Sequence, residues 1–137
     1  MRYLRERSYT NTDLNLDDIT THPGRHRIVL STPDGPYDFF IKDLLLHWRS
    51  QLLGQQWRTP TPVAPTNPFT NEPVTSLQFI RVYCIAELAG FVMHDVLTML
   101  YRAQGNMQMF YMLGAPMLRK WATYTYDLDG DVEALYE

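Results

Sequence analysis

The stretch Thr75–Gln104, TSLQFIRVYCIAELAGFVMHDVLTMLYRAQ, decides how this chain folds. Thr75 and Gln78 have the spacing of a capping box, in which each side chain bonds the backbone N–H of the other residue. Gly105 supplies a stop at the far end. We expect one long helix here, or two halves hinged near Gly90.

The charge pattern of this stretch predicts a central position for it. In the range Val82–Met93 the single charged residue is Glu87, so the helix is apolar on nearly every face. A helix that is apolar all round needs partners on every side, from the chain itself or from a neighbouring protein. Glu87 is then expected to form a core ion pair with an arginine such as Arg81, Arg102 or Arg119, because a buried unpaired charge is costly.

The region before the central stretch predicts a hairpin and a helix. Two β-rich runs, His26–Leu30 and Tyr37–Ile41, flank the turn-forming residues 33–35 (Pro-Asp-Gly). An isolated hairpin is marginal in water, so it must pack on helices, and its free edges are candidate docking sites. Ile41–Leu53 follows as a helix with one apolar face, and Gly54 is a suitable stop.

Prolines and methionines mark the remaining segments. Five of the nine prolines lie in the range Pro60–Pro73, which predicts an extended, polyproline-like strap. After the central stretch we expect a short helix over Met107–Leu113, a break at residues 114–116 (Gly-Ala-Pro), and a last helix over Pro116–Tyr124. Six of the seven methionines lie in the range Met93–Met117; this favours gap-filling core residues and leaves open a contact surface for another protein.

Together these elements predict a single α+β domain over residues 1–137, mainly α, because the chain is long enough for one hydrophobic core but not for two. The expected arrangement is an N-terminal β-hairpin, a Pro-rich strap, a long central helix and shorter C-terminal helices. By residue number the parts are an arm (1–22), the hairpin plus helix (23–54), the strap (55–74), a helical core (75–124) and an exposed acidic tail (125–137). Leu14, Leu16 and Ile19 are possible anchors for the arm.

Composition narrows the function classes. A net charge of −3 argues against a general nucleic-acid binder, whose footprint would be a basic patch. Cys84 is the only cysteine, which excludes an intrachain disulfide and fits a reducing compartment. The window Val82–Tyr101 is the best candidate for a membrane span, but it contains Glu87, His94 and Asp95, so no span is expected.

The sequence contains no arrangement that points to catalysis, a cofactor or a metal. The acidic run Asp127–Asp131 lacks the glycine and the bidentate glutamate that a calcium loop needs at its sixth and twelfth positions. His22 and His26 are four residues apart, but Pro23 interrupts any helix between them. His94 and Asp95 are adjacent on the predicted helix and therefore do not face each other. We expect a protein that is not an enzyme.

The most distinctive short motif is the box at residues 67–75, Asn-Pro-Phe-Thr-Asn-Glu-Pro-Val-Thr. Two Asx/Pro turn starters stand in tandem before a helix cap. We expect the side chains of Asn67 and Asn71 to bond nearby backbone groups. We expect Phe69 to be buried against the helix that begins near Thr75.

This box resembles a short signature in proteins of nucleocytoplasmic large DNA viruses, which runs Asn-Pro-aromatic-Thr-x-x-Pro-apolar-Ser/Thr and leads into a helix with an apolar-Tyr pair. The resemblance covers roughly Pro65–Tyr83, and Val74 departs from the aromatic residue often found there. Some proteins with the signature are virion components. The matching positions are Asn67, Pro68, Phe69, Thr70, Asn71, Pro73 and Thr75, with Val82-Tyr83 as the candidate pair.

Two functions follow as expectations. The first is a non-enzymatic structural protein, a minor capsid component of a large DNA virus, located in the virion after assembly in the host cytoplasm and packed against other capsid proteins. The resemblance and the surplus of apolar surface favour it. The alternative is a soluble adaptor that binds a partner protein through its Pro-rich strap, since Asn67-Pro68-Phe69 is also the tripeptide that endocytic EH domains recognise. The first predicts a buried strap, and the second an exposed and mobile one.

Overall fold

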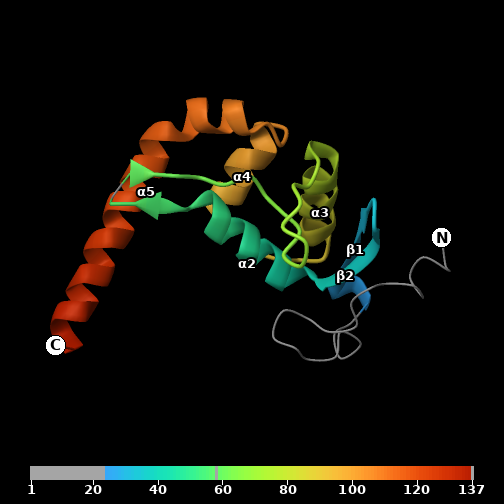
Figure 1. Ribbon diagram of the computed structural model, residues 1–137, viewed down its shortest axis with the longest axis horizontal. Coiled ribbons are helices and arrows are strands. Elements are labelled where there is room, and N and C mark those ends of the chain that lie inside the picture. The colour runs from blue at the N-terminus through green and yellow to red at the C-terminus, as the bar shows by residue number, and fades with distance from the viewer. Residues whose placement is uncertain (1–23, 58, 137) are drawn as a thin grey trace.

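The computed structural model describes residues 24–57 and 59–136, with side chains described as far as Thr123. Four α-helices and two small antiparallel sheets make up the described part of the chain, so the fold is α+β and mainly helical, as the sequence predicts. Figure 1 shows the first hairpin and helix α3 at one end of the molecule and helix α5 at the other, with α2 and α4 between them.

The first sheet is a β-hairpin that follows a short 3-10 helix, η2 (Gly24–His26). Strands β1 (Arg27–Thr32) and β2 (Gly35–Phe40) pair from one end to the other, with Thr32 opposite Gly35 across a two-residue turn. Gly35 has φ 135°, a value that favours glycine, and its carbonyl accepts a hydrogen bond from Thr32 Oγ1 at 2.8 Å.

Helix α3 closes the outer edge of β1. The carbonyls of Val29 and Ser31 lie two residues apart and therefore on the same edge of the strand. Val29 accepts from Arg81 Nη1 at 3.1 Å, and Ser31 accepts from Gln78 Nε2 at 2.8 Å. This edge is therefore occupied, and the expectation that it is a free docking edge is wrong.

Helix α2 (Ile41–Leu52) supplies the middle of the core. Its apolar residues recur at helical spacing and pack against the hairpin on one side and against helix α4 on the other. Leu53 caps the helix end, one residue before Gly54. The buried residues of α2 are Ile41, Leu44, Leu45, Trp48 and Leu52.

The Thr75–Gln104 stretch forms two helices, α3 (Ser76–Leu88) and α4 (Asp95–Arg102), so the prediction of one long helix is wrong and the hinged alternative is nearer. The capping box at the start of α3 is confirmed. A Schellman motif ends α3: Gly90 has φ 90°, its N–H bonds the Glu87 carbonyl, and the next N–H, that of Phe91, bonds the Ala86 carbonyl.

Helix α3 is not buried on every face, contrary to its predicted central position. It turns one side to the core, whereas Leu77 is 78% exposed and Leu88 is 89% exposed. The residues of α3 that it buries are Phe79, Val82, Tyr83 and Ala86. The expected enclosure by the chain itself is therefore wrong for α3.

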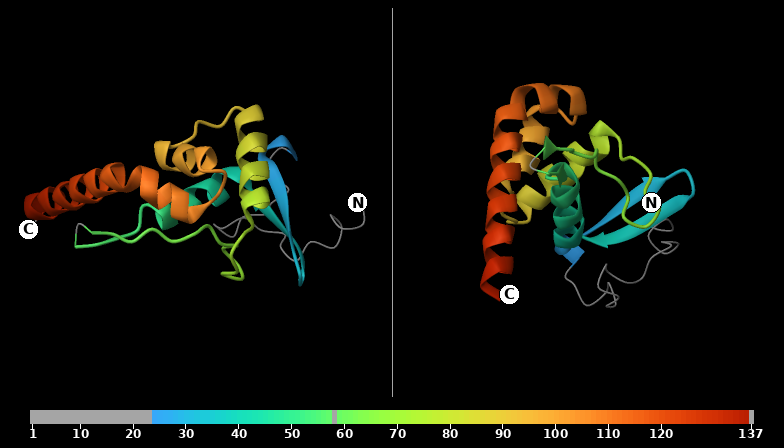
Figure 2. Two further views of the ribbon diagram at one scale, coloured as in Figure 1. Left: turned by 90° about the horizontal axis from the view of Figure 1, so that it is seen from above. Right: turned by 60° about the vertical axis from the view of Figure 1, so that its left-hand side comes forward.

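Helix α5 (Met107–Tyr136) is continuous, so the predicted break at residues 114–116 is wrong. The helix also runs through most of the segment predicted as an acidic tail, residues 125–137, and the exposure of that segment stays a prediction. Gly114 is buried where α5 approaches α4, and a Cβ there would overlap Met99 Cε. Pro116 lies on the exposed side of the helix, where its missing N–H leaves the Met112 carbonyl without its helical partner and bends the helix. Figures 1 and 2 show that bend and the second half of α5 projecting from the rest of the molecule.

The proline-rich strap is held against α2. It begins with a small hairpin whose strands, β3 (Gln55–Gln56) and β4 (Thr59–Pro60), have two residues each. This hairpin lies beside α5 (Figure 1). The chain then returns along the end of α2, where the N–H of Thr61 donates to Gly54 O at 2.7 Å and that of Val63 to Gln51 O at 2.8 Å. These bonds hold the strap to the last turn of α2 and to the residue that follows its cap.

Candidate protein-interaction surface

The Asn67 side chain organises the predicted box. Its Oδ1 accepts a hydrogen bond from the N–H of Phe69 at 2.9 Å, which makes an Asx turn. The Asn67 backbone closes the loop, since its N–H donates to Glu72 O at 2.9 Å and its carbonyl accepts from the Asn71 N–H at 2.7 Å. Asn71 has φ 61°, a left-handed conformation that asparagine tolerates better than most residues.

The base of the box is fastened to α2. Trp48 Nε1 donates to the Thr66 carbonyl at 2.8 Å. Gln51 bonds Thr66 twice, through Nε2 to the hydroxyl at 2.8 Å and through Oε1 from the backbone N–H at 3.1 Å. Thr66 also forms a β-bridge with Pro73, and the Val74 N–H donates to Pro65 O at 3.0 Å. The strap is therefore anchored at residues 65–67, all of which are buried.

Phe69 does not lie where the sequence predicts it. Its side chain is 42% exposed and packs on the hairpin, with ring centroids 6.1 Å from Tyr37 and 5.4 Å from Phe39. The Asx turn directs the residue after Pro68 toward β2, so the contact with α3 that was expected is wrong.

The other predicted site residues lie in different surroundings. Pro68 and Thr70 are partly exposed in the loop, and the Thr70 hydroxyl accepts from the Glu72 N–H at 3.2 Å. Pro73 is exposed at the base of the box. Glu87 is exposed near the end of α3, so the predicted core ion pair is wrong: the charge lies on the solvent side of a helix that is buried on one face.

Replacing Phe69 by Ala should lower the free energy of unfolding by about 1–2 kcal/mol, because a half-exposed ring gains only part of the burial energy and its aromatic contacts. The same change at Phe79, which is 2% exposed, should cost about 3–5 kcal/mol. Urea unfolding of both variants measures the difference, and equal losses would contradict this placement of Phe69.

The described histidine and carboxylate side chains do not gather into a site that could bind a metal. Among the side chains of residues 24–57 and 59–123, no group of three or more His, Cys, Asp or Glu is close enough to hold a metal ion. His94 instead caps a helix, since its Nδ1 accepts a hydrogen bond from the Val96 N–H at 3.0 Å. Burial lowers the pKa of His94, Arg49 lowers it further, and Asp95 opposes the shift.

The cap makes stability depend on pH. Because the pKa of His94 is lower in the folded protein, the unfolded chain takes up the proton first as the pH falls. Stability is therefore full above a pH of about 6.5 and declines below it, where protonation of Nδ1 breaks the cap and costs about 1 kcal/mol. His94→Asn keeps a capping oxygen and should remove the His94 part of this slope, while the part from His47, whose pKa burial also lowers, should remain. An unchanged slope in urea titrations would contradict this role.

The first half of α5 carries an exposed apolar face, which lies apart from the box at residues 67–75. No charged residue occurs between Arg102 and Arg119, so both sides of the first half of α5 are apolar. Met109, Met112, Leu113 and Met117 follow the spacing i, i+3, i+4, i+8, which places them on one side of a helix. Their exposed fractions are 48%, 72%, 71% and 44% in that order.

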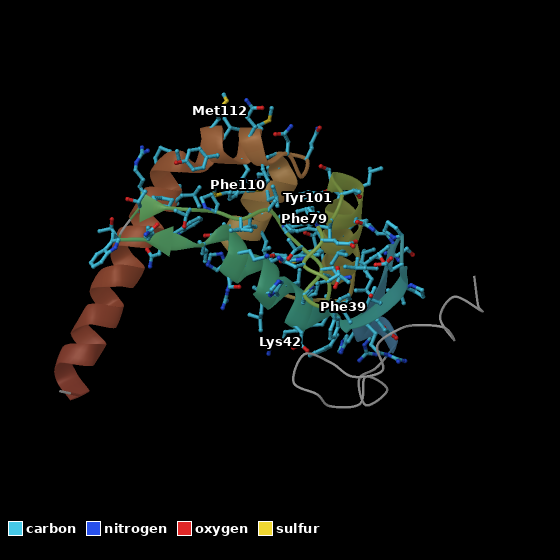
Figure 3. The ribbon with its side chains drawn as sticks, viewed as in Figure 1. Phe39, Lys42, Phe79, Tyr101, Phe110 and Met112 are labelled. Atoms are coloured by element: carbon cyan, nitrogen blue, oxygen red, sulfur yellow. The ribbon has the colours of Figure 1, made fainter. Side chains whose placement is uncertain are left out.

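The opposite side of α5 packs on the body of the protein. Phe110, Gly114 and Leu118 are buried there. Figure 3 shows Phe110 directed toward the other helices and Met112 directed away from them. We call the set Met109, Met112, Leu113, Pro116 and Met117 the methionine face; the uncharged run and this spacing were the signals in the sequence that could have found it.

Comparisons with known proteins give no further assignment. No protein family, no curated protein and no solved structure matches the chain. Within the part of the chain that the structure describes, no helix has both the length and the apolar character needed to cross a membrane.

Proposed function

We propose that this protein is a non-enzymatic structural protein that packs against neighbouring subunits, and that it is a minor capsid component of a large DNA virus. The observation that carries the proposal is the methionine face of α5. A contiguous apolar surface on a folded domain marks an interaction site, and methionine side chains adapt to the shape of a partner.

The box supports the viral part of the proposal through its resemblance to the large-DNA-virus signature. Its arrangement is that of a structural cap: Asn67 is 1% exposed and its oxygen holds the turn, and the strap is anchored to α2 through Thr66. A strap held in this way fits the capsid hypothesis better than the adaptor hypothesis, which needs the Asn67 side chain to be available to a partner.

Charge reversal on the methionine face tests the subunit contact. Met112→Glu combined with Leu113→Glu should abolish association with neighbouring subunits and leave the thermal midpoint nearly unchanged, since both side chains are more than 70% exposed. Two carboxylates in an apolar interface would weaken binding by several kcal/mol, or more than about a hundredfold. Co-purification with particles assembled in infected cells measures the effect.

The matched control is Val63→Glu, which puts one carboxylate on the strap, where the side chain is 51% exposed. It should leave incorporation into particles unchanged. Loss of partner binding with Val63→Glu but not with the α5 variant would instead favour the adaptor function. Absence of the chain from purified particles, measured by quantitative mass spectrometry, would overturn the capsid proposal.

A further inference from the structure

A groove with a basic rim lies between α2 and the turn that joins α3 to α4. Its volume is about 530 Å³. One wall is the outward side of α2, where Lys42, Leu45, Leu46 and Arg49 follow the spacing i, i+3, i+4, i+7. The other wall is residues 90–94 of the turn together with one residue of α4.

The groove combines an apolar floor with a positive charge at each end. None of the ten described residues that line it is acidic. Lys42 and Arg49 are both exposed, and no described carboxylate forms an ion pair with either of them. Between them, Leu46 is 40% exposed, and across the groove Val92 is 96% exposed. An occupant that fits must carry apolar side chains between two negative charges.

We propose that this groove binds the segment Asp13–Asp18 of the same chain. That segment reads Asp-Leu-Asn-Leu-Asp-Asp, two leucines between carboxylates, which matches the order cation, apolar, apolar, cation on α2. In an extended segment Leu14 and Leu16 point to the same side, so both would enter the groove together.

The distance between the two cations along α2 is close to the distance between the aspartates of the segment. Seven residues of helix separate Lys42 from Arg49, a rise of roughly 10 Å. Four residues of extended chain separate Asp13 from Asp17, a span of roughly 13 Å. Long side chains on α2 bridge a difference of that size.

The chain enters the described part of the structure beside this groove, which fixes the direction of binding. His26, two residues after Gly24, lies with its ring centroid 5.1 Å from that of Phe91, a residue of the groove wall. It also lies 6.5 Å from Phe40, which directly precedes α2. The entry point is therefore at the Lys42 end, which Figure 3 labels at the start of α2.

From Gly24 the chain needs six residues to reach Asp18, a reach of up to roughly 20 Å. In the proposed contact the segment would therefore run antiparallel to α2, pairing Asp17 and Asp18 with Lys42 and Asp13 with Arg49. A tethered segment has a high effective concentration at the groove, so the contact forms within one chain. The assignment does not depend on the methionine face or on the capsid proposal.

Hydrogen exchange of the full chain tests the contact. The backbone amides of Leu14–Asp18 should exchange about tenfold or more slowly than in an unfolded chain. Lys42→Glu combined with Arg49→Glu should remove this protection and leave the thermal midpoint of the domain unchanged, because both side chains are exposed. Lys120→Glu, the loss of an exposed cation on α5, is the matched control and should leave the protection intact.

Charge exchange tests the direction. Lys42→Glu should be rescued by Asp17→Lys with Asp18→Lys, and Arg49→Glu by Asp13→Lys. The crossed pair, Lys42→Glu with Asp13→Lys, should give no rescue. Rescue by the crossed pair would overturn the antiparallel register.

A spin label separates binding within one chain from exchange between copies. It is placed at Thr12→Cys in a Cys84→Ser background, and the amide signals of Leu46 and Val92 are followed. Both signals should weaken when the label and the observed nuclei are on the same chain, and neither should weaken in a mixture of labelled and observed chains. Weakening only in the mixture would assign the segment to a second copy and overturn the proposal. Unprotected Leu14–Asp18 amides in the natural chain would overturn it as well.

Discussion

Replacing Trp48 by Ala should lower the free energy of unfolding by about 3–5 kcal/mol, which is a large fraction of the stability of a typical domain. Trp48 is 0% exposed, and its ring centroid lies 5.5 Å from that of Phe79, so truncation leaves a large cavity at the centre of the core. It also removes the donor to the Thr66 carbonyl and loosens the base of the box. Urea denaturation followed by circular dichroism measures the loss.

Two matched variants isolate the causes. Trp57→Ala removes a tryptophan that is 79% exposed and should change stability by less than about 0.5 kcal/mol. Trp48→Phe keeps most of the volume and removes the donor, which should cost about 1–3 kcal/mol for the unpaired carbonyl. Equal effects of Trp48→Ala and Trp57→Ala would contradict the position of Trp48 in the core.

Gly105→Ala should cost about 2–4 kcal/mol, because conformational strain and a backbone clash occur together. Gly105 has φ 75°, and a Cβ there would lie 2.9 Å from Ser76 Cα, where the end of α4 meets the start of α3. Unlike the end of a long side chain, a Cα cannot move away without shifting its helix. Thermal and urea unfolding of the variant give the cost.

Gly90→Ala is the control that separates the two terms. Gly90 has φ 90°, but a Cβ there would have nothing within 4 Å. The strain term alone should then cost about 1 kcal/mol. Equal losses at the two glycines would show that the contact with Ser76 makes no contribution.

Signals that depend on near neighbours in the sequence predicted much of the fold. The Thr75–Gln78 capping box forms as expected, since its bonds join residues three apart. The same kind of local reasoning placed a stop at Gly105 and named Gly90 as a hinge. The sequence did not decide between a continuous helix and a break. The apolar pattern favoured a continuous helix, whereas Gly90 and His94 end α3 and begin α4 through a Schellman motif and a side-chain cap.

Errors arose where contacts between distant residues override local rules. Residues 114–116 read as a helix breaker, but Gly114 provides close contact with Met99 of α4, and Pro116 faces outward, where a bend is tolerated. Phe69 was expected on α3, but the two hairpin rings it contacts are some thirty residues away in sequence. Contacts between residues so far apart in the sequence produce no periodic pattern from which they could be predicted.

In the candidate site, too, local contacts could be predicted from the sequence and the burial of each helix face could not. The turn role of Asn67 could be predicted because it bonds the Phe69 N–H two residues on. Glu87 could not be placed, since an apolar neighbourhood in sequence does not say which face of α3 meets the core. The methionine face was only an open alternative, because methionine spacing alone does not distinguish the inner side of α5 from the outer one.

The bonded edge of β1 has a consequence for how this protein aggregates. Gln78 and Arg81 occupy the strand carbonyls at Ser31 and Val29, so no second strand can add there while α3 stays docked. Once α3 detaches, two backbone acceptors and the apolar strand beneath them are exposed in one step, which is the template that cross-β growth needs. Fibril nucleation should therefore follow the rate of α3 detachment, and conditions that speed it should shorten the lag time.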